Sequence, residues 1–113
     1  MVDYIFAETL KSGGGTFSAQ THATFRPKHG YAVSISRGSA TVCDLDEDEV
    51  IAAVERVKQA FPHARWIGTW VNEGRVVVDP VVVLWDRDDA YLLARALGQQ
   101  AFYDFRLRIS VEV

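Results

Sequence analysis

The chain has 113 residues, of which 49% are hydrophobic, 24% are charged and 12% are aromatic. This composition is typical of a globular protein, and the length fits a single domain over residues 1–113. The aromatic and β-branched content excludes disorder as the main state. The net charge of −3 argues against sequence-independent binding to nucleic acid, which requires a basic surplus.

The cysteine content and the apolar runs argue against several further classes of protein. Cys43 is the only cysteine, so the chain can form neither an intrachain disulfide nor a cysteine-based zinc site. The first four residues lack the basic start of a signal peptide, and the longest apolar run, residues 76–85, is too short to span a bilayer. We therefore expect a cytoplasmic protein with no membrane partner.

The first part of the chain predicts strands. Residues 3–10 and 16–26 flank a run of three glycines, which we interpret as a flexible hairpin connection because glycine clusters mostly mark turns. Residues 31–36 and 39–43 flank Arg37-Gly38, which predicts a second hairpin.

A helix is predicted over residues 47–60. Asp46 is the expected N-cap, with Glu49 as its reciprocal partner, and the acids of the first turn suit the positive end of the helix dipole. Pro62 ends the helix. The apolar residues recur at spacings of four and three, which places them on one face; they are Val50, Val54, Val57 and Phe61.

A hairpin and a second helix follow. Residues 66–71 and 75–84 flank a short turn that contains Gly74, and Pro80 indicates a bulge or an edge position in the second strand. Asp86 is the expected N-cap of the next helix and Gly98 its left-handed terminating residue. The buried face of this helix is expected to consist of Ala90, Leu93, Ala94 and Leu97.

Strict alternation of apolar and polar residues predicts one long strand over residues 103–113, with Asp104, Arg106 and Arg108 on its solvated face. The order of strands, helix, hairpin, helix and strand predicts an α+β fold: a single, mainly antiparallel sheet with two helices packed on one face.

The acidic run before the first predicted helix has two interpretations. Asp44, Asp46, Asp48 and Glu55 stand at positions 1, 3, 5 and 12 of a calcium-binding loop, but Glu49 occupies the sixth position, where that loop requires glycine. A solvated helix start is therefore the favoured interpretation.

No catalytic motif is assembled in the sequence, and we expect neither a metal nor a cofactor. The histidines are far apart, and Cys43 is expected to be a buried small hydrophobe rather than a nucleophile. Asp79, within an apolar strand, is expected to be a structural carboxylate. An enzyme that uses Asp79 or His63 is the least favoured hypothesis.

Two aromatic residues offer a surface. Trp66 and Trp70 should face the same side of one strand with Gly68 between them, which suits either a flat binding shelf or core beneath a helix, and core is favoured.

Arg106 and Arg108 could meet an acidic partner or a phosphate, although a solvated face is the simpler interpretation.

Several short runs, taken in order, resemble a family of small uncharacterised proteins found in bacteriophages, plasmids and actinobacteria. These runs are residues 30–34, Trp70 with residues 74–79, residues 86–90 and residues 98–104. The resemblance implies a mobile-element setting, in which small acidic α+β proteins often bind host machinery. It supplies no catalytic residues.

We therefore expect a non-enzymatic accessory protein that binds and modulates, and most simply inhibits, a host defence or nucleic-acid-processing protein. The expected contact to a basic partner is the acidic run, made of Asp44, Asp46, Glu47, Asp48 and Glu49. We also expect the terminal strand to be able to pair two copies as a homodimer.

The alternative is a protein that binds a small molecule, such as a nucleotide. Its site would combine Gly13, Gly14, Gly15, Arg26, Lys28, Tyr31 and Trp70.

Overall fold

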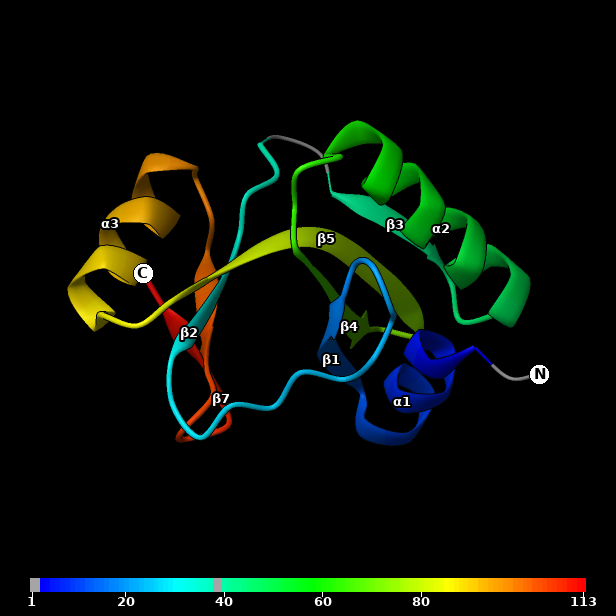
Figure 1. Cartoon of the computed structure of the whole chain (residues 1–113), viewed down its shortest axis with the longest axis horizontal. Helices are drawn as coiled ribbons and strands as arrows, with labels where there is room; N and C mark the ends of the chain where they lie inside the picture. Colours follow the sequence, from blue (N-terminus) through cyan, green and yellow to red (C-terminus); the bar gives the residue numbers. More distant parts are fainter. Residues whose placement is uncertain (1–2, 38–39) are drawn as a thin grey trace.

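The computed structural model describes residues 3–37 and 40–113. Within these residues, three helices contact a single antiparallel sheet of seven strands, which confirms the α+β fold (Figure 1). The elements in chain order are α1 (Tyr4–Ser12), β1 (Gly14–Ser18), β2 (Tyr31–Ser34), β3 (Thr41–Asp44), α2 (Glu47–Ala60), β4 (Trp66–Asn72), β5 (Arg75–Leu84), α3 (Arg87–Ala96), β6 (Ala101–Asp104) and β7 (Ile109–Glu112).

The prediction of a strand over residues 3–10 is wrong, because this segment forms α1. Asp3 caps the helix by accepting a hydrogen bond from the backbone N–H of Phe6 at 3.0 Å. Gly13 ends it in the left-handed region (φ 79°), where its N–H donates to the carbonyl of Thr9. The three glycines are therefore not a hairpin connection: the first ends a helix and the other two begin β1.

The two helices predicted from their start signals are confirmed. The Asp46 carboxylate accepts from the N–H of Glu49 at 3.1 Å, and the Asp86 carboxylate accepts from the N–H of Asp89 at 3.1 Å. α2 covers the predicted range, and Gly98 follows α3 in the left-handed region (φ 70°). At these two helices, an aspartate followed by apolar residues at helical spacing gave the correct local signal.

The hairpin of β4 and β5 is also confirmed. Asn72 pairs with Arg75 across a two-residue turn in which both Glu73 and Gly74 have positive φ (53° and 78°). Such turns match the right-handed twist of the flanking strands, and glycine adopts this conformation at no steric cost.

The second predicted hairpin does not form. β2 pairs with residues 81–84 of β5 and β3 with residues 75–78, so the two strands lie end to end along the same edge of β5. Gly38 of the predicted turn lies outside the described residues. Pro80 stands where β3 gives way to β2, and its register with β4 continues without a bulge. The prediction of a bulge or an edge position is therefore wrong: β5 is an interior strand, and the carbonyl of Pro80 accepts from the N–H of Ile35 at 3.0 Å, but Pro80 has no N–H to complete that pair.

The expected long terminal strand is a hairpin of β6 and β7. Asp104 is only 3% exposed rather than solvated, because its carboxylate accepts from the N–H groups of Arg106 and Leu107 and closes the turn. The two arginines therefore lie in a turn and not side by side on a strand. Alternation alone could not reveal the break, since it continues unchanged through the four-residue connection.

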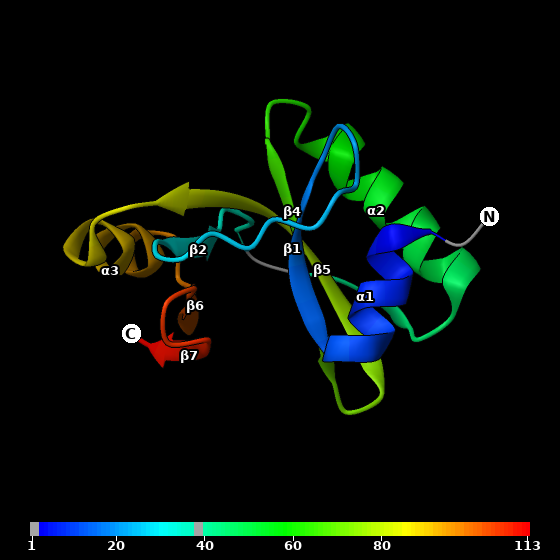
Figure 2. The same ribbon diagram turned by 60° about the horizontal axis from the view of Figure 1, so that its bottom comes forward.

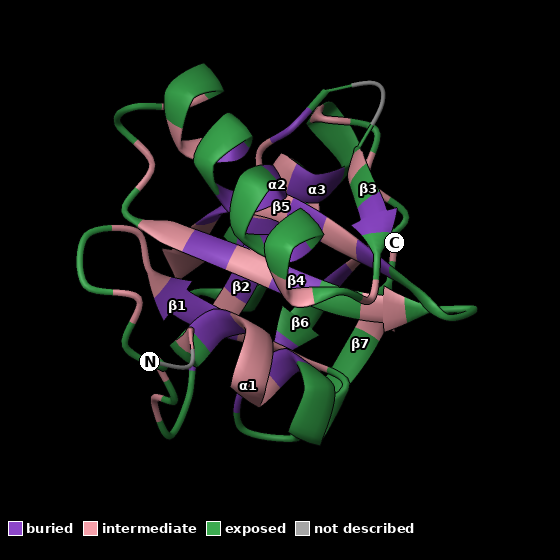
Figure 3. Cartoon of the chain, turned by 90° about the vertical axis from the view of Figure 1, so that its right-hand side faces the viewer, coloured by how far each residue is buried: buried purple, intermediate pink, exposed green. Residues whose placement is uncertain are grey.

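The sheet order is β1-β4-β5-β2-β6-β7, with β3 also paired to β5. α1 and α2 cover β1, β4, β3 and the first half of β5, whereas α3 covers β2, β6 and the second half (Figure 2). Buried residues alternate with less buried ones over residues 75–80 of β5 (Figure 3), and even-numbered residues of this strand pack in the clusters beneath the helices of both halves. β5 is thus the strand that joins the two halves of the protein.

Candidate functional site

The second half of β5 has an open edge on its β4 side. β4 begins at Trp66, which pairs with Val81. On this side of β5, no strand of the described residues pairs with residues 82–84, whereas β2 pairs with them on the other side. The carbonyl of Pro80 accepts from the N–H of Ile35 at 3.0 Å, which shows that even-numbered residues of β5 direct their backbone polar groups toward β2. Because direction alternates along an antiparallel strand, the N–H and C=O of Val83 point to the open side. Neither group has a hydrogen-bond partner among the described residues.

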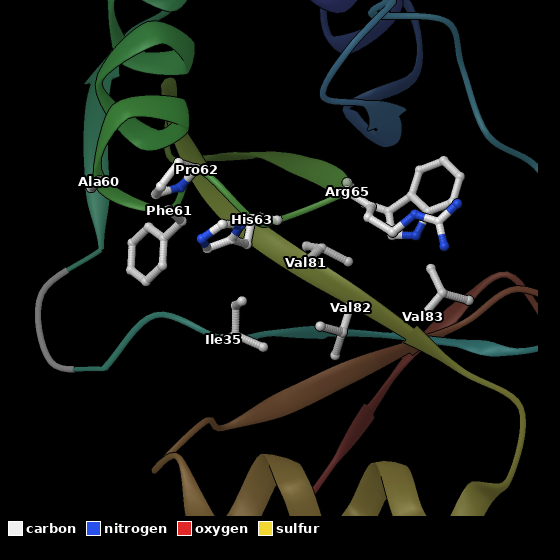
Figure 4. A pocket seen from close by; sticks show the side chains of 11 residues that line it. Ile35, Ala60, Phe61, Pro62, His63, Arg65, Val81, Val82 and Val83 are labelled. Atoms are coloured by element: carbon white, nitrogen blue, oxygen red, sulfur yellow. The ribbon is translucent and has the colours of Figure 1, made fainter.

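A groove with a volume of about 520 Å³ lies against this open edge (Figure 4). One wall is the end of α2 with the loop that follows it, and the other is formed by β5 and the residue after β2. Most of its lining is apolar. The lining residues are Ile35, Ala60, Phe61, Pro62, His63, Ala64, Arg65, Trp66, Val81, Val82 and Val83.

The loop between α2 and β4 keeps the groove open. The N–H of Ala64 donates to the carbonyl of Phe61 at 3.0 Å, and the carbonyl of Arg65 accepts from Ala19 at 2.9 Å. Continuing the register of β4 and β5 by two residues would place residue 64 opposite Val83. The tight turn removes Ala64 from that position, and the site beside Val83 stays free for another strand.

The ionisable groups in the groove lining are His63 and Arg65. No carboxylate lines the groove, although the whole chain carries a net charge of −3. The groove therefore combines apolar walls, an unpaired backbone edge and a basic rim. These three features favour an extended ligand with apolar and acidic groups.

Sequence reasoning missed this groove, although one signal was present. The strands predicted at residues 66–71 and 75–84 differ in length, so a hairpin register set by the turn leaves the end of the longer strand unpaired. Whether another strand or a loop covers such an end is decided by contacts distant in sequence.

The acidic run predicted as a partner contact lies at the other end of α2. Two of its members have roles within the chain: Asp44 forms an ion pair with Arg75 (3.3 Å), and Asp46 caps the helix. Glu47, Asp48 and Glu49 form the first turn. A 14-residue helix is about 20 Å long, so these acids are well separated from the groove at its C-terminal end.

The structure does not gather the predicted small-molecule site. Gly14 lies opposite Trp70, and Gly13 and Gly15 flank it, but Tyr31 packs edge-on against Phe102 under α3. Arg26 is ion-paired with Glu8, and Lys28 is exposed. The glycines also follow the C-terminal end of a helix, whose partial negative charge disfavours phosphate.

Asp79 is a partly buried carboxyl at the junction of the two halves. It accepts a hydrogen bond from the Ser36 hydroxyl at 3.2 Å. Burial raises its pKa above the ordinary value, and the hydrogen bonds from Ser36 and Ser34 oppose that rise. Asp79 pairs with Gly68 of β4 and follows Val78, which pairs with Thr41 at the start of β3.

Three further residues from the sequence analysis, Cys43, Trp66 and Trp70, differ in burial. Cys43 is buried, and that burial raises the pKa of its thiol, as expected for a core residue. Trp66 stacks on Phe25 with ring centroids 4.1 Å apart, whereas Trp70 is 57% exposed on the same strand. The expected aromatic pair is therefore divided between a packed and an exposed member.

Among the described residues, no group of three or more His, Cys, Asp or Glu side chains could hold a metal ion. In the same part of the chain, none of the helices has the length and apolar character needed to cross a membrane. Comparisons of the chain with protein-family models, with curated proteins and with solved structures found no match.

Proposed function

We propose that the chain is a non-enzymatic protein-binding module that captures an extended segment of a partner as an added strand on the open edge of β5. The single observation that carries the proposal is the unpaired backbone of Val83 beside an apolar groove. In β-strand addition, main-chain hydrogen bonds supply affinity, and pockets for alternate side chains supply specificity.

The bound segment is expected to alternate apolar and acidic residues. One side of an added strand faces the apolar walls, where Val82 and Ile35 would contact its apolar side chains. Residues directed toward the loop meet His63 and Arg65, which favour carboxylates. The open edge is short, so a transient interaction is expected rather than an obligate one.

The wider role is part of the same proposal. The resemblance to mobile-element proteins suggests that the partner is a host protein, such as a defence or nucleic-acid-processing factor. A module that occupies an extended segment of such a factor would modulate it by blocking the contacts that this segment makes elsewhere. The acidic start of α2 remains a candidate second contact, limited to Glu47, Asp48 and Glu49, whose side chains do not cap the helix.

The test is selection from a library of short random peptides, followed by binding assays with three variants. Val83→Pro removes the N–H that faces the open edge without removing a hydrogen bond within the sheet, and should weaken the selected peptides about tenfold. Val83→Thr keeps the N–H and the side-chain shape, and should bind as the wild type does. Ala64→Phe fills the groove and should abolish binding.

The matched control is Ala52→Phe, which adds the same bulk at an exposed position of α2. It should leave peptide binding unchanged. The proposal fails if no peptide is enriched over the Ala64→Phe protein, or if Val83→Pro and Val83→Thr bind equally well.

A further inference from the structure

A second hollow lies on the other side of the loop that walls the groove. Its volume is about 550 Å³, and it opens between the end of β1, the last turn of α2 and that loop. Its lining is more polar than that of the groove. The lining residues are Ser18, Ala19, Gln20, Lys58, Phe61, Pro62, His63, Ala64, Arg65 and Trp66.

The ionisable groups that line this hollow are Lys58, His63 and Arg65. No carboxylate is among the lining residues, in a chain that carries more acids than bases. A concave site lined by one sign of charge concentrates ions of the opposite sign. Ser18 and Gln20 also line the hollow and add a hydroxyl and an amide to its polar groups.

Lys58 is held at the hollow by a chain of polar contacts. Its ammonium lies 3.2 Å from Nε2 of His22, and Nδ1 of His22 lies 3.5 Å from the Asp3 carboxylate. Because an ammonium can only donate, Nε2 accepts and the ring proton resides on Nδ1, which faces Asp3. This arrangement orients Lys58, whose ammonium has one further contact, with the Glu55 carboxylate at 3.5 Å.

A hydrogen-bonded turn sets the backbone conformation of His22, whose ring contacts Lys58. His22 adopts the left-handed conformation (φ 63°), which is uncommon for a residue other than glycine. Its N–H donates to the carbonyl of Ser18 at 2.8 Å, and the Ser18 hydroxyl accepts from the N–H of Thr21 at 3.1 Å. The turn thus places His22 against Lys58 at one wall of the hollow.

The acid nearest to Lys58 on its own helix is a weak competitor. Glu55 lies 3.5 Å from the ammonium as an i,i+3 pair, and its side chain is half exposed. Pairs of this kind contribute little in water. An anion that contacts Lys58 and Arg65 together can therefore displace it.

We infer that this hollow binds the phosphate group of a small organic phosphate. Lys58 and Arg65 would contact the phosphate oxygens, and Phe61 and Trp66 would provide apolar surface for the organic part. The volume falls within the range of about 300–1,000 Å³ found for small-molecule sites. The hollow and the proposed peptide groove share six lining residues, 61–66, whereas Lys58 and the end of β1 line the hollow alone and Val83 lines the groove alone.

The test is calorimetric titration with inorganic phosphate, pyrophosphate, adenosine monophosphate and adenosine. The monophosphate should bind more tightly than inorganic phosphate, because it adds apolar contacts, and adenosine should show no binding because it lacks the charge. The double variant Lys58→Ala, Arg65→Ala should lose at least tenfold in affinity. Lys58→Arg should retain most of it.

The matched control is Lys11→Ala, Lys28→Ala, which removes the same charge from exposed positions outside the hollow. It should bind as the wild type does. Equal weakening in both double variants would reduce the effect to net charge and overturn the inference, as would the absence of binding to every phosphate. Val83→Pro should leave phosphate binding unchanged, so the inference and the proposed function fail separately.

Discussion

The two halves of the sheet differ in how completely they bury their apolar residues. In the first half, ten of the described residues from α1, α2, β1, β3, β4 and β5 form one buried cluster. In the second half, the described residues form two smaller buried clusters: four residues beneath α3, and three more, Ala32, Val81 and Phe105. Large apolar side chains remain exposed in both halves, for example Leu10 and Trp70 in the first and Trp85 and Leu92 in the second, so the halves differ in the size of their buried clusters.

Because of this difference, we expect stability and binding to depend on different parts of the protein. Apolar burial is the main favourable term in folding, so the first half supplies most of the free energy of unfolding. The second half, with fewer buried contacts, is expected to open more readily. The groove lies between the two: its loop wall belongs to the first half, and the open edge of β5 belongs to the second.

The largest expected effect comes from matched phenylalanine substitutions in the two clusters. Phe17→Ala, in the first cluster, should lower the free energy of unfolding by about 5 kcal/mol, and Phe102→Ala, in the second, by about 3 kcal/mol. The larger cluster surrounds its phenylalanine on more sides and leaves a larger cavity. Chemical denaturation followed by circular dichroism measures both values.

If Phe17→Ala does not fold, Phe17→Leu and Phe102→Leu replace the pair with a smaller cavity at each site. Equal losses in the two halves, or a larger loss for the Phe102 variant, would contradict the comparison.

A smaller effect is expected at the turn of the terminal hairpin. Asp104→Ala leaves the N–H groups of Arg106 and Leu107 without their carboxylate acceptor, and should cost about 2 kcal/mol. Because this turn belongs to the second half, the loss should be local. Hydrogen exchange should speed up at β6 and β7 and stay unchanged at β4; equal acceleration at β4 would show that the halves unfold as one.

The sequence predicted the parts of this comparison that depend on local signals. Asp46 and Asp86 marked two helices, and Gly74 marked the central hairpin. The segment after Asp3 carried a similar cap, but its apolar residues 4–7 are consecutive and show no helical repeat, and the segment was predicted as a strand beside the glycines. The choice was settled by packing, since Ile5 and Thr9, four residues apart, are both buried in the first half.

The candidate site depended on long-range contacts and was harder to predict. The sequence predicted β2 and β3 as strands. It did not predict that both pair with the same edge of β5, which lies more than thirty residues away along the chain. The unpaired edge at Val83 follows from where β4 begins and how the loop before it turns. Pro62 stands at the second position of the Phe61–Ala64 turn, where proline is favoured, so the turn itself has a local signal. The sequence does not show that this turn leaves Val83 without a strand beside it, whereas the acidic run was conspicuous for its composition and largely serves the start of α2.

A pH-dependent effect is expected at the boundary between the halves. The pKa of Asp79 is raised in the folded protein by burial, so the folded state holds a proton more tightly than the unfolded state, whose ordinary value is 3.8. Stability should therefore fall as pH rises from about that value through the raised pKa, and then stay lower. Asp79→Asn should be more stable than the wild type at neutral pH.

The gain from Asp79→Asn should shrink as pH falls from the raised pKa to the unfolded-state value of 3.8, because the wild-type carboxyl becomes neutral in the folded protein over this range. Thermal melts across the acidic range give the comparison. A variant that is less stable than the wild type at neutral pH would show that the charged carboxylate is favoured at the junction.

The smallest expected effect concerns the acids at the start of α2, which lie in the first half and away from the groove. Replacing Glu47, Asp48 and Glu49 by their amides keeps the Asp46 cap and removes charge that favours the helix dipole, at a cost of about 1 kcal/mol. Peptides selected on the groove should bind this variant within about twofold of the wild type, because about 20 Å of separation exceeds the screening length at physiological salt. Fluorescence anisotropy with a labelled peptide measures the affinity. A loss of tenfold or more would place the contact on the acidic turn, and binding would then belong to the well-packed half of the sheet rather than to the junction.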